Sequence, residues 1–229
     1  MAGVTQSLQA DSETVPSLRG SLAARLDFPT RRGRFVELRP LSRRDYPYLY
    51  RLSTDPRTGY RWRFRGIVPR EDRFEDLLWE GVLAQFLLVR PKSQKPIGLA
   101  SAYAASLQHG HTNVGVVLDT QSLQTGAGVE AMWLFAKYCF AAWPLRKLYM
   151  EVPEFNLKQF KHAVGRYLHE EACLKADDYC AGRLWDTYIL ALYPEDIEKF
   201  AQDMPRLTSI GCSESRNERS GMEVARVQS

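Results

Sequence analysis

Two glycines lie one residue apart in the stretch SLQTGAGVEAMWLFAKYCF, residues 122–140. Gly126 and Gly128 carry no side chains, so the backbone N–H groups around them can approach a bound anion closely. The helix predicted to follow would add unpaired N-terminal donors and the positive end of its dipole. This pattern suits a loop that holds a phosphate group. It is also typical of a flexible turn before an ordinary helix, and it lacks the third glycine of the dinucleotide-binding GxGxxG motif.

Two residues elsewhere in the chain could transfer a proton. His111 lies in the stretch QHGHT and has an intrinsic pKa near neutrality, although an ordinary loop histidine has the same surroundings. Glu151 interrupts the apolar run KLYMEVP, and a buried carboxylate is costly unless it is paired. Glu151 is therefore predicted either to act in catalysis or to pair with an arginine. Cys139 falls inside the predicted helix rather than in a nucleophile elbow, so a covalent acyl-enzyme is not expected.

Residues 31–70 concentrate positive charge, with twelve arginines, three acidic residues and no lysine. The segment carries +9 within a chain of net charge +4, which leaves 4 − 9 = −5 for the rest. Arginines interleaved with aromatic rings in GYRWRFRG, residues 59–66, suit stacking on bases beside phosphates. The alternatives are solvated arginines, and an edge strand whose aromatic face packs inward. The candidate substrate- or RNA-binding residues are Arg61, Trp62, Arg63 and Arg65.

The composition is that of a globular protein, with 45% apolar and 25% charged residues in 229. No run of about 18 apolar residues predicts a membrane span, and the first residues do not resemble a secretory signal. The four cysteines lack CxxC spacing, so neither a zinc site nor a disulfide framework is indicated. We expect a cytoplasmic protein without a metal cofactor.

The elements that must position these residues follow from the apolar periodicity. Strands are predicted over residues 34–41, 83–91, 97–106, 112–118 and 145–153, and helices over 43–54 and 70–81 and after the glycine loop. The strand 145–153 is nearly all apolar and is expected to be central and covered on both faces. Residues 157–174 predict an amphipathic helix that buries Phe160, Val164, Tyr167 and Leu168. A closing hairpin, residues 177–194, is expected to turn near Ala181 and Gly182.

This order, β-α-α-β-β-β-α-β-α-β-β, predicts an α/β fold with a mixed sheet and helices on both faces. Residues 1–30 are polar and aperiodic and indicate a flexible N-terminal arm. Residues 203–229 are rich in Ser, Arg and Glu and indicate a disordered tail. A single domain is expected over residues 31–202.

The glycine loop and its neighbours resemble the GNAT superfamily of acyltransferases, most closely the branch that acetylates the N-termini of ribosomal proteins. The resemblance covers residues 33–197 and rests on three stretches, NVGVVLDTQSLQTGAGVEAMWLFAKYCF, LRKLYMEVPEFN and YCAGRLWDTYILALYPEDI. Two positions depart from the family pattern. Leu123 stands where the loop usually has Gln or Arg, and Asn113 stands where the strand often has Glu.

The resemblance implies a GNAT fold that moves an acyl group from acetyl-CoA or another acyl-CoA to an amine of a small molecule or peptide. It implies that the pantetheine pairs with the backbone of Val116, Val117 and Leu118, and that Asn156 holds its far side. The pyrophosphate would meet the loop and the first helical turn. The residues implied there are Gln124, Thr125, Gly126, Ala127, Gly128 and Val129.

Two other functions remain open at this level. A minority of GNAT-like transferases take the aminoacyl group of a charged tRNA, and the arginine excess at 31–70 would suit tRNA. A non-catalytic GNAT-like module that binds RNA or a protein partner has the same sequence features. A homodimer is compatible with either.

Overall fold

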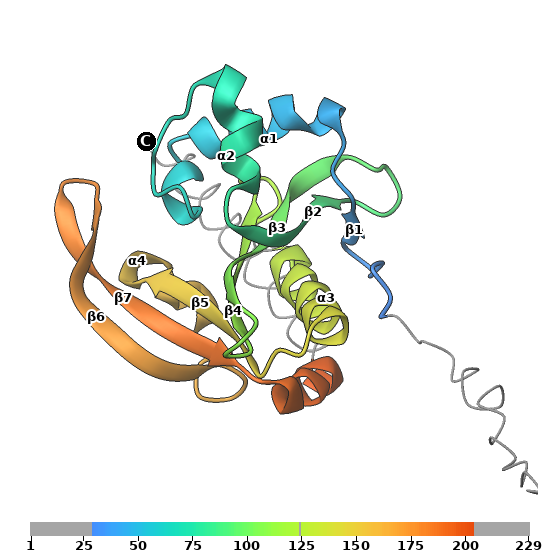
Figure 1. Cartoon of the computed structure of the whole chain (residues 1–229), viewed down its shortest axis with the longest axis vertical. Coiled ribbons are helices and arrows are strands. Elements are labelled where there is room, and N and C mark those ends of the chain that lie inside the picture. The colour runs from blue at the N-terminus through green and yellow to red at the C-terminus, as the bar shows by residue number, and fades with distance from the viewer. Residues whose placement is uncertain (1–28, 124, 204–229) are drawn as a thin grey trace, which may run out of the picture.

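A computed structural model of the chain describes residues 29–123 and 125–203 (Figure 1). Its core is one seven-stranded sheet with the strand order β1-β2-β3-β4-β5-β7-β6. The strands are β1 Glu37–Arg39, β2 Val82–Val89, β3 Pro96–Ser106, β4 His111–Leu118, β5 Lys147–Pro153, β6 His169–Cys180 and β7 Arg183–Leu192. The helices are α1 Tyr46–Thr54, α2 Phe74–Trp79, α3 Ala127–Ala142 and α4 Glu154–Leu157, and residues 194–203 are also helical.

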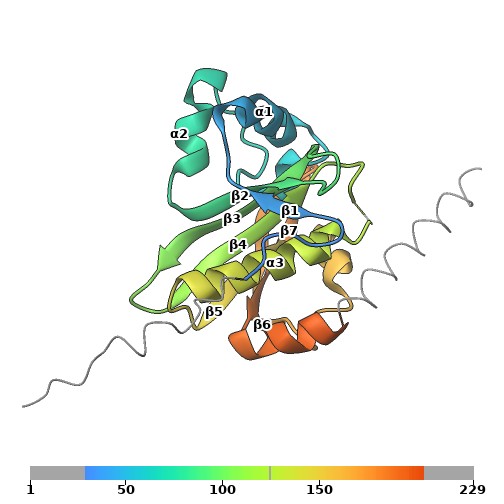
Figure 2. The ribbon, with the colours of Figure 1, turned by 90° about the vertical axis from the view of Figure 1, so that its right-hand side faces the viewer.

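The sheet is antiparallel except between β4 and β5. Parallel neighbours need a long crossover, and α3 provides it by returning the chain across one face of the sheet. Figure 2 shows α1 and α2 on one side of the sheet and α3 on the other. The predicted mixed sheet with helices on both faces is therefore confirmed.

Each face of the sheet has its own apolar core, because side chains alternate along every strand. On the α1/α2 face, Leu87, Leu99 and Val117 pack against Leu49 of α1 and Leu78 of α2. On the α3 face, a larger core joins α3 to all of the inner strands. Its fully buried members include Leu88, Ala100, Leu134, Phe135, Leu148 and Leu190.

Most of the predicted elements are confirmed, and the 3-10 turn Arg43–Asp45 that leads into α1 shows why. Ser42 and Asp45 form a capping box, in which Asp45 Oδ2 accepts hydrogen bonds from Ser42 N at 2.8 Å and from Ser42 Oγ at 2.7 Å. Arg39 also donates to Asp45, at 2.7 Å. Such local signals are readable from sequence because both partners lie within one turn.

The amphipathic helix predicted over 157–174 is wrong. The structure has only α4 and one 3-10 turn there, Lys158–Phe160, and β6 begins at His169. Gly165 has φ +77°, a left-handed conformation that ends a helix. Residues 169–174 instead pair with β7, so pairing within the sheet prevails over a helical apolar period.

β5 is central, as expected, but the prediction that it is covered on both faces is wrong. Leu148, Met150 and Val152 are buried on the α3 face. On the other face Tyr149 is only partly buried and the side chain of Glu151 is 39% exposed. Both residues belong to the part of the sheet next to the closing hairpin.

The closing hairpin turns where predicted, at Ala181 and Gly182, whose φ values are +53° and +82°. Consecutive positive φ values match the twist of a tight hairpin. Figure 1 shows β6 and β7 reaching well past the rest of the sheet. The expected arm, 1–30, and tail, 203–229, lie almost wholly outside the described residues. Within the described residues, no helix is long and apolar enough to span a membrane.

Candidate active site where β4 and β5 separate

β4 and β5 run side by side for only three residue pairs. His111 pairs with Lys147, Thr112 with Leu148, and Asn113 with Tyr149. Beyond Asn113, β4 continues to Leu118 but pairs with β3 alone among the described residues. The edge of β4 that faces β5 is therefore free from 114 to 118, which includes the predicted Val116, Val117 and Leu118. An extended chain could hydrogen-bond to this edge.

Gly115 leaves room beside the point of separation. A Cβ built on Gly115 would meet no atom closer than Tyr103 Cε1, at 3.9 Å. The strand period of two places Gly115 on the same face as Asn113, which contacts Glu151 of β5. We call Asn113, Gly115 and Glu151 the vertex.

The glycine loop lies at the far end of β4. Gly126 has φ +79° and precedes α3, and Thr125 Oγ1 donates to Ser122 O at 2.8 Å. Among the described residues, no partner is recorded for the N–H groups of Gly128 and Val129. N–H groups of this first helical turn that have no acceptor within the described residues could donate to a phosphate group. Gln124 lies outside the described residues.

Two contacts join this loop to the sheet. A Cβ on Gly128 would be 3.3 Å from Leu118 Cδ1, so the first turn of α3 packs directly on the end of β4. Arg90, which follows β2, donates from Nη2 to Ser122 Oγ at 3.2 Å. A guanidinium therefore reaches the loop from another strand, although Leu123 leaves the loop itself without one. Sequence reasoning missed Arg90 because it lies 32 residues from Ser122.

Glu151 is held at the vertex by neighbours on different elements. Asn113 Nδ2 donates to Glu151 Oε1 at 2.6 Å, and Arg65 Nη2 lies 3.7 Å from Glu151 Oε2. Arg65 Nη1 also donates to Asp178 Oδ2 of β6 at 2.8 Å. The expectation of a buried Glu151 is wrong, whereas its pairing with an arginine is present.

His111 lies away from the vertex. It is the first residue of β4, and its ring stacks with His109 at 6.3 Å and meets Tyr149 edge-on at 5.4 Å. Its buried Nδ1 has no hydrogen-bond partner among the described residues. Of the two proton-transfer candidates, only Glu151 reaches the point where the strands separate.

Tyr103 of β3 is a polar neighbour that sequence reasoning missed. Its register partner is Asn113, and its ring leans over Gly115. Burial, followed by the charge of Glu151, raises the pKa of Tyr103 to about 12. The phenol therefore stays protonated at neutral pH and can donate a hydrogen bond. Nothing in the sequence IGLASAYAAS distinguishes this tyrosine from a core aromatic residue.

Asn156 lies in α4, directly after β5, and is 8% exposed. Its Oδ1 accepts a hydrogen bond from Gln159 Nε2 at 3.4 Å. α4 follows the strand that leaves β4, so Asn156 is on the β5 side of the separation. Its predicted contact with a pantetheine stays a prediction.

The arginine-rich loop packs its aromatic rings inward. Trp62 and Phe64 are each 5% exposed and belong to the α1/α2 core, so the ring of Trp62 is not available to stack on a base. Arg63 donates to the carbonyl oxygens of Leu77, Leu78 and Glu80 at 2.8–3.1 Å and so caps α2. Burial lowers the pKa of Arg63. Arg61 is exposed, and Arg65 is the one member of the predicted set in contact with the vertex.

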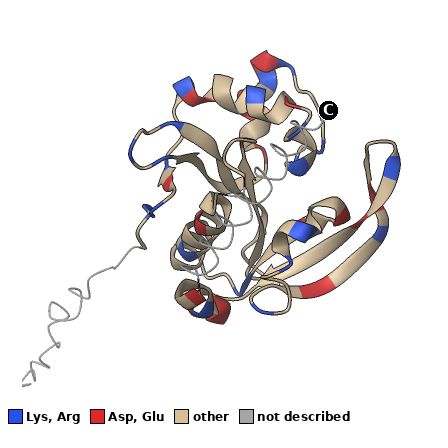
Figure 3. Ribbon diagram, turned by 180° about the vertical axis from the view of Figure 1, so that it is seen from behind, with Lys and Arg blue, Asp and Glu red and all other residues tan. Residues whose placement is uncertain are grey.

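Many arginines of the 31–73 segment have local partners. Figure 3 shows acidic residues beside the basic ones around α1 and α2. The ion pairs that arginines of this segment form with nearby acids are Arg32–Glu37, Arg39–Asp45, Arg57–Asp55, Arg70–Asp72 and Arg73–Asp76. Five of the thirteen arginines at 31–73 are therefore paired with a nearby acid, although the segment keeps a positive net charge.

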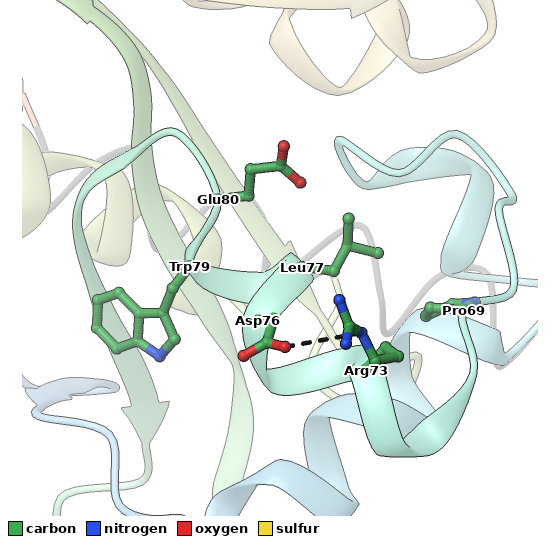
Figure 4. Close-up of a pocket in the computed structure, with 6 residues that line it drawn as sticks. All are labelled: Pro69, Arg73, Asp76, Leu77, Trp79 and Glu80. Carbon is green, nitrogen blue, oxygen red and sulfur yellow. Dashed lines mark ion pairs between the residues drawn. The ribbon is translucent and has the colours of Figure 1, made fainter.

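A surface pocket at α2 is separate from the vertex. Figure 4 shows its lining, in which Arg73 pairs with Asp76 at 3.7 Å. The lining residues are Pro69, Arg73, Asp76, Leu77, Trp79 and Glu80. None of them contacts the vertex or the glycine loop, so this pocket is not the candidate active site.

The sequence profile of the acetyltransferase (GNAT) domain matches residues 36–163, more than half of the chain. The chain belongs to the GNAT acetyltransferase family. The predicted family is thereby confirmed, and this GNAT acetyltransferase is an acyltransferase that acts on amines. The matched segment contains the free edge of β4, the glycine loop and the vertex residues Asn113, Gly115 and Glu151.

Solved structures share the fold at low sequence identity. A spermidine N-acetyltransferase from Vibrio cholerae, in complex with CoA and spermine, has a TM-score of 0.64 at 18% identity, over 72% of this chain and 99% of that one. A spermidine/spermine N-acetyltransferase from Vibrio cholerae in complex with manganese ions has a TM-score of 0.58 at 19% identity, over 69% of this chain and 92% of that one. The structure of a putative acetyltransferase has a TM-score of 0.60 at 21% identity, over 76% of this chain and 90% of that one. No curated protein matches the chain.

Proposed function

We propose that this GNAT acetyltransferase moves an acetyl group from acetyl-CoA directly to a primary amine at the vertex. The observation that carries the proposal is the free edge of β4, which begins beside Gly115 and Glu151 and ends at the glycine loop. One extended substrate could thus pair with a strand, place a phosphate at a helix N-terminus and reach a carboxylate. Two reactants held together in this way need little further assistance.

The chain's own groups fit coenzyme A in three places. The backbone of Val116 to Leu118 would pair with the pantetheine arm, and Asn156 would hold the arm from the β5 side. The N–H groups from Thr125 to Val129, with Arg90 beside them, would hold the pyrophosphate. When bound, acetyl-CoA would supply the activated thioester, and coenzyme A would leave as the thiol.

Glu151 is the proposed general base. An amine reaches the site as an ammonium ion, and a carboxylate at the vertex both attracts it and accepts its proton. Asn113 orients that carboxylate from β4. Tyr103, which stays protonated, is a hydrogen-bond donor for the oxygen or sulfur that gains negative charge.

The acceptor is a small molecule or peptide amine. The similar Vibrio cholerae structures are of enzymes that acetylate spermidine, which supports a small amine. The resemblance to the ribosomal-protein branch supports a peptide N-terminus. An aminoacyl-tRNA donor receives less support, because Trp62 is buried and many arginines of segment 31–73 are paired.

The test uses the full chain with acetyl-CoA and a panel of primary amines and N-terminal peptides. We expect thiol release that depends on the amine, is unaffected by ribonuclease, and accompanies acetyl-CoA binding measured by calorimetry. Failure to bind acetyl-CoA contradicts the proposal. Activity that ribonuclease abolishes supports the tRNA donor instead.

A further inference from the structure

Three charged side chains from three separate elements meet at the vertex, and one of them is the vertex residue Glu151. Arg65 comes from the loop between α1 and α2, Glu151 from β5 and Asp178 from β6. The guanidinium contacts Asp178 at 2.8 Å and Glu151 at 3.7 Å. The side chain of Asp178 is 13% exposed and lies against this guanidinium, and a carboxylate with so little exposure is costly to leave unpaired.

The backbone on both sides of this contact is strained. Arg65 has φ +49°, a left-handed conformation that is unfavourable for a residue with a side chain, and Gly66 follows at +83°. On the other side, the β6–β7 register shifts between Leu174 and Asp178, and Ala176 has φ +51°. Backbone strain of this kind persists only where contacts with the surrounding structure hold the residue in place, and it is frequent at functional sites.

The charges of this trio sum to one negative unit, because two carboxylates face one guanidinium. The polar neighbours from the other strands add none, since Asn113 is neutral and the Tyr103 phenol stays protonated. Arg63 packs over the Tyr103 ring at 5.7 Å, and its positive charge is opposed by the nearby carboxylate of Glu80, so this pair leaves the sum unchanged. One ammonium group would balance the site, whereas a polyamine would bring uncompensated charges against Arg65.

The geometry points to Arg65 as the residue that sets the charge class of the acceptor. It assigns to this site an amine with a single positive charge on an otherwise uncharged chain, and it excludes polyamines. Arg65 is the repulsive element that specificity between charged ligands requires. The inference rests on the proposed function and narrows it, because the similar solved structures include spermidine acetyltransferases.

The experiment compares two acceptors of equal length, hexylamine and 1,6-diaminohexane, which differ by one terminal ammonium group. The measured quantity is the ratio of kcat/KM for hexylamine to that for the diamine, with acetyl-CoA as donor. We expect a ratio of about ten or more for the wild-type chain, and poor activity with spermidine. Two substitutions should move the ratio in opposite directions.

Arg65→Gln leaves two carboxylates unopposed and should lower the ratio about tenfold, whereas Asp178→Asn leaves the trio neutral and should raise it. A general loss of structure would not produce opposite shifts. Arg70→Gln is the control, because Arg70 is 81% exposed, belongs to the same arginine-rich segment and pairs only with Asp72 among the described residues.

Each outcome bears on one of the two proposals. A wild-type preference for the diamine or spermidine, or a ratio that neither substitution moves, overturns the role of Arg65 and leaves the proposed function standing. Acetyl-CoA binding without thiol release for any amine overturns the proposed function itself, and the assignment of Arg65 falls with it.

Discussion

The carboxylate of Glu130 occupies the place where a side chain on Gly33 would lie. A Cβ built on Gly33 would be 2.3 Å from Glu130 Cδ. Glu130 is 4% exposed and accepts hydrogen bonds from the N–H groups of Arg34, Phe35 and Val36 at 2.7–2.8 Å. The first turn of α3, next to the glycine loop, is thereby fastened to the segment that enters β1.

Gly33→Ala should destabilise the protein, because the added methyl group displaces a carboxylate that satisfies three backbone N–H donors, of which that of Val36 is buried. We expect a loss of about 2–3 kcal/mol in the free energy of unfolding, measured by urea titration. Glu130→Gln should cost about 1–2 kcal/mol, since its amide group accepts at only one end. The double variant should lose little more than Gly33→Ala alone, and strictly additive losses would refute the shared contact.

Glu151→Gln should lower kcat for acetyl transfer by about a hundredfold, because the amide cannot take a proton from the amine. Its affinity for acetyl-CoA, measured by calorimetry, should not change. His111→Ala should have a much smaller effect, since His111 lies back from the vertex. The reverse order of the two losses would transfer the role of base to His111.

Gly126→Ala should weaken acetyl-CoA binding about tenfold, equivalent to about 1.4 kcal/mol, because alanine strains the left-handed residue that aims the N–H groups of α3. Gly182→Ala is the matched control. Gly182 has φ +82° with no atom within 4 Å of a built Cβ, so it carries the same strain far from the loop. Equal binding losses in both variants would show that strain alone, and not the loop, is being measured.

Glu171 links three strands, since it accepts hydrogen bonds from Lys147 and Tyr149 of β5 and from Tyr193 after β7. The Lys147 hydrogen bond, followed by that of Tyr193, lowers the pKa of Glu171 to about 2. A carboxyl group with a depressed folded-state pKa stabilises the fold above its unfolded pKa, about 4.3, and loses this contribution as the pH falls toward 2.

Glu171→Gln should therefore destabilise the protein by about 1–2 kcal/mol at pH 7 and progressively less between about pH 4.3 and pH 2. Urea unfolding at pH 7, 4 and 3 measures this. The exposed neighbour Glu170 provides the control variant, Glu170→Gln, which should show no such pH dependence. A constant difference at all three pH values would mean that Glu171 is not charged in the fold.

Cys139 should resist alkylation in the native protein. It is fully buried in α3, and burial raises the pKa of its thiol to about 12, so the reactive thiolate is scarce. Cys173 and Cys180 are only partly buried and should react first. Iodoacetamide labelling followed by peptide mass spectrometry measures the order, and early labelling of Cys139 would contradict its burial.

The sequence predicted those elements whose determinants are local. The Ala181–Gly182 turn and the glycines at the start of α3 are present as expected, and the Ser42–Asp45 capping box is a further determinant that acts within a few residues. The segment 157–174 was misread because its apolar residues have a helical period, while its actual partner is β7, a strand still to come in the chain. Local secondary-structure propensity is a weak guide where pairing with a distant strand decides the conformation of a segment.

Only part of the candidate site could be predicted from the sequence. The glycine loop and the free strand edge have a sequence signature, and so do the residues that the family resemblance places along them. For Trp62 and Arg63 the sequence leaves a binding surface and an inward-packed aromatic face both open, because alternating aromatic and basic residues look alike whether the rings point out or in. These side chains are buried because α1 and α2 pack over them, and no local sequence pattern encodes that packing.

By itself the sequence determined the family, most of the elements and the glycine loop at the start of α3, because the signals for these lie close together in the chain. Only the tertiary structure decided what surrounds the carboxylate of Glu151. Arg65 and Asp178 are 113 residues apart and meet because a loop and a hairpin converge over one sheet. The net charge of that site depends on which side chains the fold brings close together, and the order of residues along the chain does not specify this.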